Sequence, residues 1–334
     1  MQGAQTRKQV GLRQVAIVGN ALASWRRTPY FQLMRLLLID GHYYLYRSFF
    51  AIRGLTNSRG EPTNAIYGFL KAMRKMVADL KPDLGAVVWD HGLPDRRTSL
   101  QSAYKQHRPE MPLELRSQEI WLQDKLPLTG FSSLSTPATE ADDLIASYTR
   151  KAASAGHNVV IATNDKDILQ LTSEQVAIYS TAKADAGRDA FALLSPREIK
   201  EKWGVEPSQI GEILALTGDS TDNIPGVTGI GGKTAAQLIH NYGTVENLLR
   251  NLAAVLPEKL RERLANAKDL IQANRRMIAL DDDLPLPKAL EDLRITPQYN
   301  LLIPALEECE FRTLVKEVEA ESERQNTLQQ AELL

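Results

Sequence analysis

The sequence is poor in cysteine and in long apolar runs. Cys309 is the only cysteine in 334 residues, which excludes an internal disulfide framework and a cysteine-rich zinc site. A single cysteine also fits a reducing compartment, so we expect a cytoplasmic location. No apolar run is long enough to span a bilayer, so we expect no association with membranes. Hard metal ions held by carboxylates remain compatible with this composition.

The chain also has almost no net charge. Its 40 basic and 41 acidic residues leave a formal charge of -1, which neither favours nor excludes nucleic acid as a partner. Apolar residues make up 43% of the chain, enough for a buried core, and the length allows one large domain or two of ordinary size. Evidence for function must therefore come from where the charges cluster.

Residues 1–33 differ from the rest because their five basic residues are not opposed by any acidic one. A signal peptide would use residues 14–23 as its apolar region, but Gly19 and Asn20 interrupt that region. An acid-poor transit peptide is a second interpretation. We favour a disordered extension or an upstream start, because a strand pattern begins directly after Met34.

From Arg35 onward, short β-rich runs alternate with amphipathic helices, a pattern typical of a largely parallel sheet with helical crossovers. Strands are predicted at residues 35–39, 85–89 and 158–163, with a further one at 177–179. Helices are predicted at residues 63–80, 113–126, from 140 onward, 196–203, 208–216 and 233–241. Residues 181–189 predict a loop or hairpin tip, and 317–334 a frayed helix or charged tail.

Each of the first three strands ends in an aspartate, namely Asp40, Asp90 and Asp165. The carboxyl ends of parallel strands share one edge of the sheet, where α/β folds place their sites, so we expect these side chains to converge. The acidic run of residues 140–143 opens a helix near the same edge. Each acid alone is better explained as a helix cap, whereas the group together is not.

The candidate metal ligands form a larger set of carboxylates. They are Asp40, Asp90, Glu140, Asp142, Asp143, Asp165, Asp167, Asp219 and Asp222. All-oxygen ligation favours Mg²⁺ or Mn²⁺ over zinc. Because there are more carboxylates than one ion needs, the set predicts two ions, the arrangement used for in-line displacement at a phosphodiester.

A basic segment follows the second strand. It contains Arg96, Arg97, Tyr104, Lys105, His107 and Arg108, with Asp95 as the only opposing charge before Glu110. A solvated charged loop is one interpretation. An aromatic residue within a basic run favours a nucleic-acid strand instead, with Tyr104 stacking on a base and the cations delivered to a scissile phosphate.

A glycine-rich hairpin joins two predicted helices near residues 217–234. A nucleotide-binding P-loop is excluded, because five residues separate Gly226 from Gly232 where that motif requires four. Backbone N–H groups at the start of the second helix, together with Lys233, suit a nucleic-acid phosphate better.

Eight motifs in one order resemble the 5' nuclease domain of bacterial DNA polymerase I and its phage and flap-endonuclease-like relatives. They are Asp40-Gly41-His42, residues 58–62, 67–69, Tyr104-Lys105 with Arg108-Pro109, Glu140 to Asp143, Asp165-Lys166-Asp167, residues 218–226, and 229–231 with 233–235. The resemblance covers about residues 34–316 and implies a protein that stands alone, without a polymerase domain. Asn164 and Gly232 depart from the family pattern, and neither departure removes a ligand.

The resemblance implies a PIN-like core with a helical arch, followed by a helix-hairpin-helix module that grips duplex DNA and often binds K⁺. The implied organisation is an extension at 1–33, the core at 34–204 with the arch at about 91–126, the helical domain at 205–316 and a tail at 317–334.

The resemblance also implies a role for each site residue. Asp40, Asp90, Glu140, Asp142 and Asp143 would hold the first ion, with Asp142 placed to bridge, and Asp165, Asp167, Asp219 and Asp222 would serve the second. Arg97 and Lys105 would touch the scissile phosphate, and Tyr104 would stack beside them. Arg108, Gly226, Gly229, Gly231, Lys233 and Thr234 complete the expected DNA contacts.

We therefore expect a monomeric, structure-selective 5'-3' exonuclease and flap endonuclease that acts on DNA ends, flaps or nicks in replication and repair. A DNA polymerase and a ligase are the expected partners. Two alternatives remain at this point: a non-catalytic protein that binds DNA junctions, and an RNase H-like nuclease that removes RNA primers.

Overall fold

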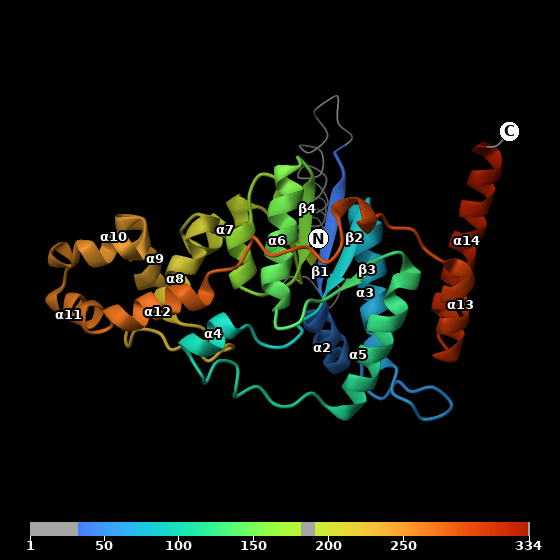
Figure 1. The fold of residues 1–334 in the computed structure, drawn as a ribbon, viewed down its shortest axis with the longest axis horizontal. Coiled ribbons are helices and arrows are strands. Elements are labelled where there is room, and N and C mark those ends of the chain that lie inside the picture. Colours follow the sequence, from blue (N-terminus) through green and yellow to red (C-terminus); the bar gives the residue numbers. More distant parts are fainter. Residues whose placement is uncertain (1–32, 182–190, 333–334) are drawn as a thin grey trace, which may run out of the picture.

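The computed structural model describes residues 33–181 and 191–332. Its centre is a six-stranded sheet in the order β3-β2-β1-β4-β5-β6, flanked by helices on both faces (Figure 1). All neighbouring strands are parallel except β5 and β6. The predicted α/β fold with a largely parallel sheet is confirmed. The extension predicted for residues 1–33 and most of the loop predicted at 181–189 lie outside the described residues.

The strands form where the sequence is continuously apolar. Their bounds are β1 (Arg35–Asp40), β2 (Leu84–Val88), β3 (Ser132–Leu134), β4 (Asn158–Ala162), β5 (Val176–Thr181) and β6 (Phe191–Leu194). Residues 36–39 of β1 are fully buried, as expected for a central parallel strand covered on both faces. The sequence prediction missed β3 and β6 because runs of three and four residues give almost no periodic signal.

Alternate residues of β1 enter two separate cores. Leu37 and Ile39 pack with helices α2 (Gly41–Ala51), α3 (Asn64–Leu80) and α5 (Leu113–Lys125). Leu36 and Leu38 lie on the opposite face. There they pack with α6 (Ala141–Ser154) and the 3₁₀ helix η2 (Asp167–Leu171), a core that continues into the helical lobe.

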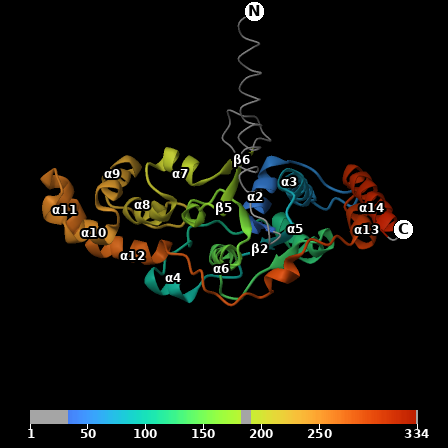
Figure 2. The same cartoon turned by 90° about the horizontal axis from the view of Figure 1, so that it is seen from above.

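The helical lobe lies at one end of the sheet (Figures 1 and 2). It contains α7 (Pro196–Trp203), α8 (Ile210–Thr217), α9 (Gly232–Tyr242), α10 (Val245–Arg250), α11 (Glu258–Asn266) and α12 (Lys268–Ile278). The predicted capping box between Ser195 and Glu198 begins α7. Helices α8 and α9 flank the predicted hairpin, and α12 supports it, because Asn274 Nδ2 donates to the Pro225 carbonyl at 2.7 Å.

Helices α13 (Tyr299–Glu308) and α14 (Arg312–Glu332) lie at the opposite end from the lobe, beside α3 (Figures 1 and 2). Leu314 and Val318 of α14 are buried. Residues 317–332 are helical, as the first of the two predictions for this stretch has it, but the helix begins at Arg312, before the predicted boundary at residue 317. The buried residues of α14 lie in its first half, whereas the prediction was made from the charged residues of its second half.

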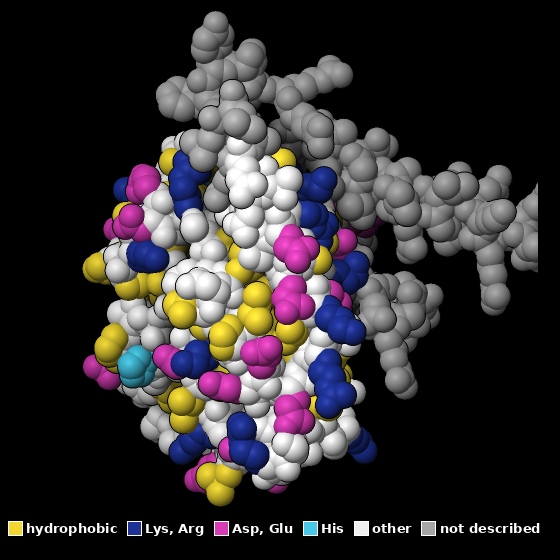
Figure 3. All heavy atoms as spheres, turned by 90° about the vertical axis from the view of Figure 1, so that its right-hand side faces the viewer, with side chains coloured by type: hydrophobic (Ala, Val, Ile, Leu, Met, Phe, Trp, Pro, Cys, Tyr) yellow, Lys and Arg dark blue, Asp and Glu magenta, His cyan; other side chains and the backbone are white. Residues whose placement is uncertain are grey.

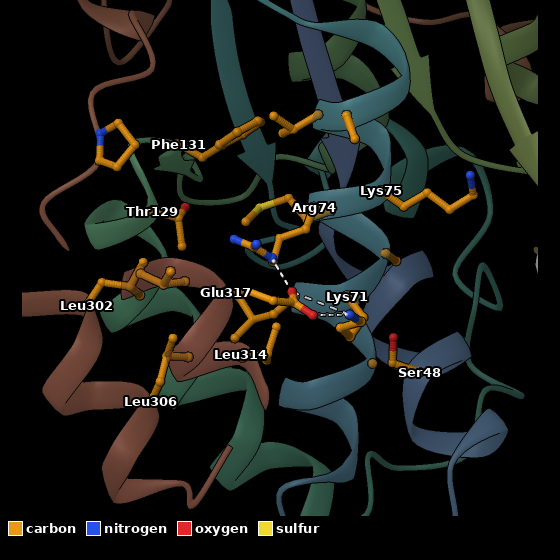
Figure 4. Close-up of a pocket in the computed structure, with 18 of the residues that line it drawn as sticks. Ser48, Lys71, Arg74, Lys75, Thr129, Phe131, Leu302, Leu306, Leu314 and Glu317 are labelled. Atoms are coloured by element: carbon orange, nitrogen blue, oxygen red, sulfur yellow. Dashed lines mark hydrogen bonds and ion pairs between the residues drawn. The ribbon is translucent and has the colours of Figure 1, made fainter. Parts of the chain in front are cut away.

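A cavity of about 1250 Å³ separates α3 from α13 and α14. Its apolar lining includes Met73, Phe131, Leu302, Leu306 and Leu314. Figure 3 shows apolar side chains gathered in the middle of this face, with acidic and basic side chains around them. Glu317 crosses the cavity to Lys71 at 3.1 Å and to Arg74 at 3.2 Å (Figure 4). Within the described residues, no helix has both the length and the apolar character needed to cross a bilayer.

Candidate active site

Asp40 occupies the carboxyl end of β1 and caps α2. Its side chain accepts hydrogen bonds from the Tyr43 amide at 3.0 Å and from Thr163 Oγ1 at 2.8 Å. Burial, reinforced by the charges of Asp90 and Asp165, raises the pKa of Asp40 to about 6. A carboxylate in this position therefore needs a nearby cation to stay ionised at low cost.

Asp90 follows β2 by two residues and faces the start of α6. Its Oδ1 accepts from the Ala141 amide at 2.7 Å, and its Oδ2 lies 3.3 Å from His42 Nδ1. Burial alone would favour the neutral acid, but the hydrogen bond and charge of His42 lower the pKa of Asp90 below its usual value. Asp90 is thus ionised and held by two elements.

Glu140 and Asp143 flank the first turn of α6 and are almost fully buried. Arg97 binds both: it donates to Asp143 at 2.8 and 2.9 Å and pairs with Glu140 through Nη1. The amide of Asp281 also donates to Asp143, at 2.9 Å. Both Asp143 oxygens are therefore already engaged by protein groups.

Asp142 lies between those two acids, on the second residue of α6. Burial and the charges of Asp165, Asp40 and Asp90 raise its pKa well above the usual value. Charges that repel one another in this way must lie close together. Asp142 of α6 is therefore near Asp40 and Asp90, which lie at or just after the ends of β1 and β2, and near Asp165 in the loop after β4. Asp142 is at the centre of these acids.

Asp165 and Asp167 lie where β4 passes into η2. The Asp167 amide donates to Asp165 Oδ1 at 2.8 Å, which orients the two acids together. Within residues 33–181 and 191–332, Asp167 Oδ1 is buried and has no hydrogen-bond partner. Burial and the charges of Asp165, Asp222 and Asp219 raise the pKa of Asp167 well above its usual value.

Asp219 and Asp222 come from the turn after α8, which the lobe carries to the same edge. Lys166 Nζ lies 3.1 Å from Asp219, and Arg108 Nη2 lies 2.5 Å from Asp222. The turn is closed by paired backbone hydrogen bonds between Asp219 and Ile224, at 2.8 and 2.9 Å. All nine predicted carboxylates therefore face one region, which we call the carboxylate cluster.

The donor set of the carboxylate cluster fits hard divalent ions, because it is all oxygen and contains an orphaned buried oxygen on Asp167. Across the described part of the chain, however, no three acidic, histidine or cysteine groups already lie in a geometry that would hold a metal. The physical reason is that protein cations and amides occupy several of the oxygens. Glu140, Asp143, Asp219 and Asp222 each contact a lysine or arginine.

The basic segment folds onto the carboxylate cluster. It contains a short helix, α4 (Asp95–Leu100), and α5 follows it. Arg97 and Tyr104 are each 3% exposed, and the Lys105 side chain is 8% exposed and pairs with Glu140, so a solvated loop is excluded for these three residues.

Tyr104 is not available for stacking in this conformation. Its hydroxyl donates to Glu140 Oε1 at 3.1 Å or to Asp222 Oδ2 at 3.2 Å. The Lys105 amide donates to the Asp222 carbonyl at 3.3 Å, which pins the segment to the acidic turn. The stacking role predicted for Tyr104 therefore requires this segment to move.

The hairpin between α8 and α9 leaves its glycines close to backbone or open to solvent. A Cβ on Gly226 would lie 2.0 Å from the Thr217 carbonyl oxygen, and Gly229 has a φ of +77°. Gly231 caps α9, and Lys233 beside it is exposed while Thr234 is partly exposed. The first amides of a helix have no intrahelical acceptor, so this end is suited to an anion.

Sequence reasoning missed three groups that contact the carboxylate cluster, and a fourth, Glu119, that reaches it only through His42. Thr163 binds Asp40, Lys166 binds Asp219, and His42 lies between Asp90 and Glu119. Thr163 and Lys166 sit next to predicted ligands, which was an available signal. Glu119 lies on an ordinary-looking helix far along the chain, and no local pattern reveals it.

Comparison with known proteins agrees with this geometry. Residues 35–204 match the family model of the 5'-3' exonuclease N-terminal resolvase-like domain, and residues 205–300 match that of the 5'-3' exonuclease C-terminal SAM fold. The 5'-3' exonuclease of Aquifex aeolicus is 37% identical over 286 residues, covering 85% of this chain and 95% of that protein.

The thermostable DNA polymerase I of Thermus thermophilus is 38% identical over 283 residues, covering 85% of this chain. The chain spans only 33% of the length of that polymerase.

Solved structures show the same fold at low identity. A flap endonuclease of bacteriophage T5, in a complex with DNA and metal ions, has a TM-score of 0.60 at 21% identity, covering 85% of this chain and 98% of that one. The catalytic core of Rad2 with DNA substrate has a TM-score of 0.53 at 16% identity, covering 88% and 93%. With two family models matched end to end and a full-length relative, the chain belongs to the 5'-3' exonuclease family.

Proposed function

We propose that this protein is a metal-dependent, structure-selective 5' nuclease that hydrolyses DNA phosphodiester bonds at 5' ends and flaps. One observation carries the proposal. Nine carboxylates from five separate parts of the chain face one edge of the sheet, and four of them (Asp40, Asp142, Asp165 and Asp167) have raised pKa values that a bound cation would relieve. Membership of the 5'-3' exonuclease family gives this edge its substrate class.

The carboxylates divide into two groups in the proposal. Asp40, Asp90 and Asp142, with Glu140, would hold a first Mg²⁺ or Mn²⁺, and Asp165, Asp167, Asp219 and Asp222 a second. When bound, such ions supply a water of lowered pKa and stabilise the leaving oxygen. We place Asp143 in a supporting role, because it also accepts from the Asp281 backbone amide, a contact that release of Arg97 would leave in place. Structures of the bacteriophage T5 enzyme with metal ions, one of them with divalent zinc ions, support divalent ions in this fold.

The cations of the basic segment have two partners in the proposal. Without divalent ions, Arg97 and Lys105 neutralise Glu140 and Asp143. With the carboxylates otherwise neutralised, the same side chains are released to bind the scissile phosphate, and Tyr104 becomes available to a base. The basic segment would thereby give up its contacts with the Glu140 and Asp143 carboxylates and bind the substrate phosphate instead.

The hairpin would grip the duplex beside the cleavage point. Its contacts are to phosphate, from the amides at the start of α9 and from Lys233, so they position DNA without reading its sequence. A K⁺ ion held by the hairpin carbonyls belongs to the same proposal. A DNA polymerase and a ligase remain the proposed partners, since relatives carry this unit within a polymerase.

One observation favours a different function, a DNA-junction-binding protein without catalysis. Arg97, Lys105 and Arg108 satisfy carboxylates that a nuclease needs for metal. If these ion pairs are permanent, the carboxylate cluster is a structural feature.

The deciding experiment uses a 5'-flap DNA with wild type and Asp142→Asn, in Mg²⁺ and in chelator. We expect the wild type alone to cut, in Mg²⁺ alone, while both proteins bind the flap in chelator. Binding by both proteins without cleavage by either would favour the junction-binding function. An RNA-tipped flap of the same sequence tests the primer-removal alternative, which predicts faster cleavage of the RNA-tipped substrate.

A further inference from the structure

His42 bridges two carboxylates from distant parts of the chain. It is the second residue of α2, and its ring lies between Asp90 and Glu119 of α5. The Asp90 backbone N–H donates to Nδ1 at 3.2 Å, and Nδ1 also lies 3.3 Å from Asp90 Oδ2, while Nε2 is 2.8 Å from Glu119 Oε1. The side chains of His42 and Glu119 are 19% and 17% exposed and that of Asp90 is 34% exposed, so solvent screens the contact with Glu119 less than the contact with Asp90.

Aromatic packing fixes the plane of the imidazole. The Trp89 ring meets it edge to face, with centroids 5.6 Å apart and planes at 89°. Trp89 is itself held, because its Nε1 donates to Ser133 Oγ at 3.0 Å and its ring stacks on Phe69. Gly41 permits this packing, since a Cβ there would lie 2.5 Å from the Trp89 ring. The imidazole therefore reaches Asp90 in one defined orientation.

Asp90 is in this way held from two sides. The Ala141 amide of α6 donates to Oδ1 at 2.7 Å, while His42 contacts Oδ2. These two contacts restrain the plane of the carboxylate and leave each of its oxygens a further lone pair. Side chains that orient a ligand in this manner raise its affinity for metal.

Glu119 is not needed to attach α5 to the core. Its neighbour Gln118 already does so, accepting from the Ala65 amide at 2.7 Å and donating to Asn64 Oδ1 at 2.9 Å. Leu115 and Leu122 of the same helix are fully buried. The polar contacts of Glu119 are instead to His42 and Gln123.

We infer that Glu119 and His42 are positioning residues for Asp90, forming a carboxylate–imidazole–carboxylate chain that ties the helix after the basic segment to a ligand of the first ion. The inference rests on the proposed function, in which Asp90 binds metal.

The test measures Mn²⁺ binding to metal-free protein without DNA, by electron paramagnetic resonance of the free ion. Glu119→Gln and His42→Ala are expected to weaken the binding of one Mn²⁺ by about 10–100-fold. His42→Asn keeps a donor to Asp90 but does not reach Glu119, and it should fall between His42→Ala and wild type. Asp124→Asn is the matched control, because it removes an exposed acid from the same helix and leaves His42 untouched.

Two further readouts separate positioning from folding. Thermal unfolding of metal-free Glu119→Gln should match that of the control, so this variant keeps the test valid even if His42→Ala does not fold. With 5'-flap DNA, saturating Mn²⁺ should restore most of the kcat of Glu119→Gln, while flap affinity in chelator stays at the wild-type value.

Two results would overturn the inference, and they are distinguishable. Equal Mn²⁺ affinity in wild type, Glu119→Gln and His42→Ala would remove the positioning role and leave the proposed function intact. No Mn²⁺ binding by the wild type would remove the metal site itself, and the inference with it.

Discussion

Two groups of ion pairs in this molecule use the same side-chain chemistry at very different depths. In the carboxylate cluster, the side chains of Arg97, Glu140 and Asp143 are 3%, 1% and 4% exposed. Across the cavity between α3 and α14, those of Lys71 and Glu317 are 42% and 35% exposed. Water screens the second group but not the first, so loss of one partner should destabilise the protein far more in the first group than in the second.

The difference indicates what each group is for. The pairs between α3 and α14 only link two helices, and either partner can be hydrated when the other is lost. A buried carboxylate without a cation has no such alternative, so the carboxylate cluster needs positive charge in every state. Arg97 and Lys105 provide it here, and divalent ions provide it in the proposed active form.

Loss of Arg97 is the largest expected effect. Arg97→Ala leaves Glu140 and Asp143 buried without their cation, which should lower the free energy of unfolding by about 3–5 kcal/mol. Urea denaturation in chelator measures this loss, and Mg²⁺ should recover part of it. Arg96→Ala is the matched control, because that side chain is 39% exposed and should change stability far less. Equal losses in the two variants would contradict the comparison.

Asp142→Asn is expected to slow cleavage of a 5' flap by at least about 100-fold, which raises the barrier by about 3 kcal/mol. The amide removes one charge from a repelling group, so metal-free stability should not fall. Single-turnover cleavage and chelator binding assays measure the two quantities, and Lys105→Ala should likewise slow cleavage more than it weakens binding. Loss of binding alone would contradict the catalytic assignment.

Metal-free stability should fall as pH rises from about 4 to about 7. The pKa of Asp40 is about 6 in the folded protein, against an ordinary value of 3.8. In this window the folded state holds more protons than the unfolded state, so raising the pH favours unfolding. The change for Asp40 is on the order of 2–3 kcal/mol. Asp40→Asn should flatten the urea-denaturation profile, and a profile that rises with pH would contradict the site electrostatics.

Glu317→Gln should have the smallest effect. The ion pairs with Lys71 and Arg74 are partly exposed, so their loss should cost about 1 kcal/mol or less. Flap cleavage should be unchanged, because the cavity lies away from the carboxylate cluster. Glu319→Gln, an exposed acid of the same helix, serves as control. If Glu317→Gln lowered the free energy of unfolding as much as Arg97→Ala, burial would not distinguish the two groups of ion pairs.

The sequence predicts helices and strands well where a regular apolar pattern or a capping motif marks them. The strand ending at Asp40, the helix over residues 63–80 and the capping box at Ser195 all form as expected. The sequence does not predict helix α2, because residues 41–51 are rich in aromatic residues and their apolar side chains do not recur at helical spacing. Helix α14 was divided wrongly because its buried residues are confined to its first half.

The sequence predicts which acids of the candidate site lie together, because the order and direction of the strands determine this. Strand ends meet at one edge of a parallel sheet, which places Asp40, Asp90 and the acids near Asp142 together. What local sequence does not contain is the partner of each acid. The burial of Tyr104 and the contact of Glu119 with His42 depend on long-range packing, and Gln118 beside Glu119 looks equally polar.

The most direct test of the central claim, that the carboxylate cluster is a divalent-metal centre, is anomalous diffraction from a crystal soaked in Mn²⁺. We predict an anomalous peak among Asp40, Asp90 and Asp142. A crystal with no peak at this edge of the sheet, grown from a preparation that still cuts 5'-flap DNA in Mn²⁺, would contradict the account.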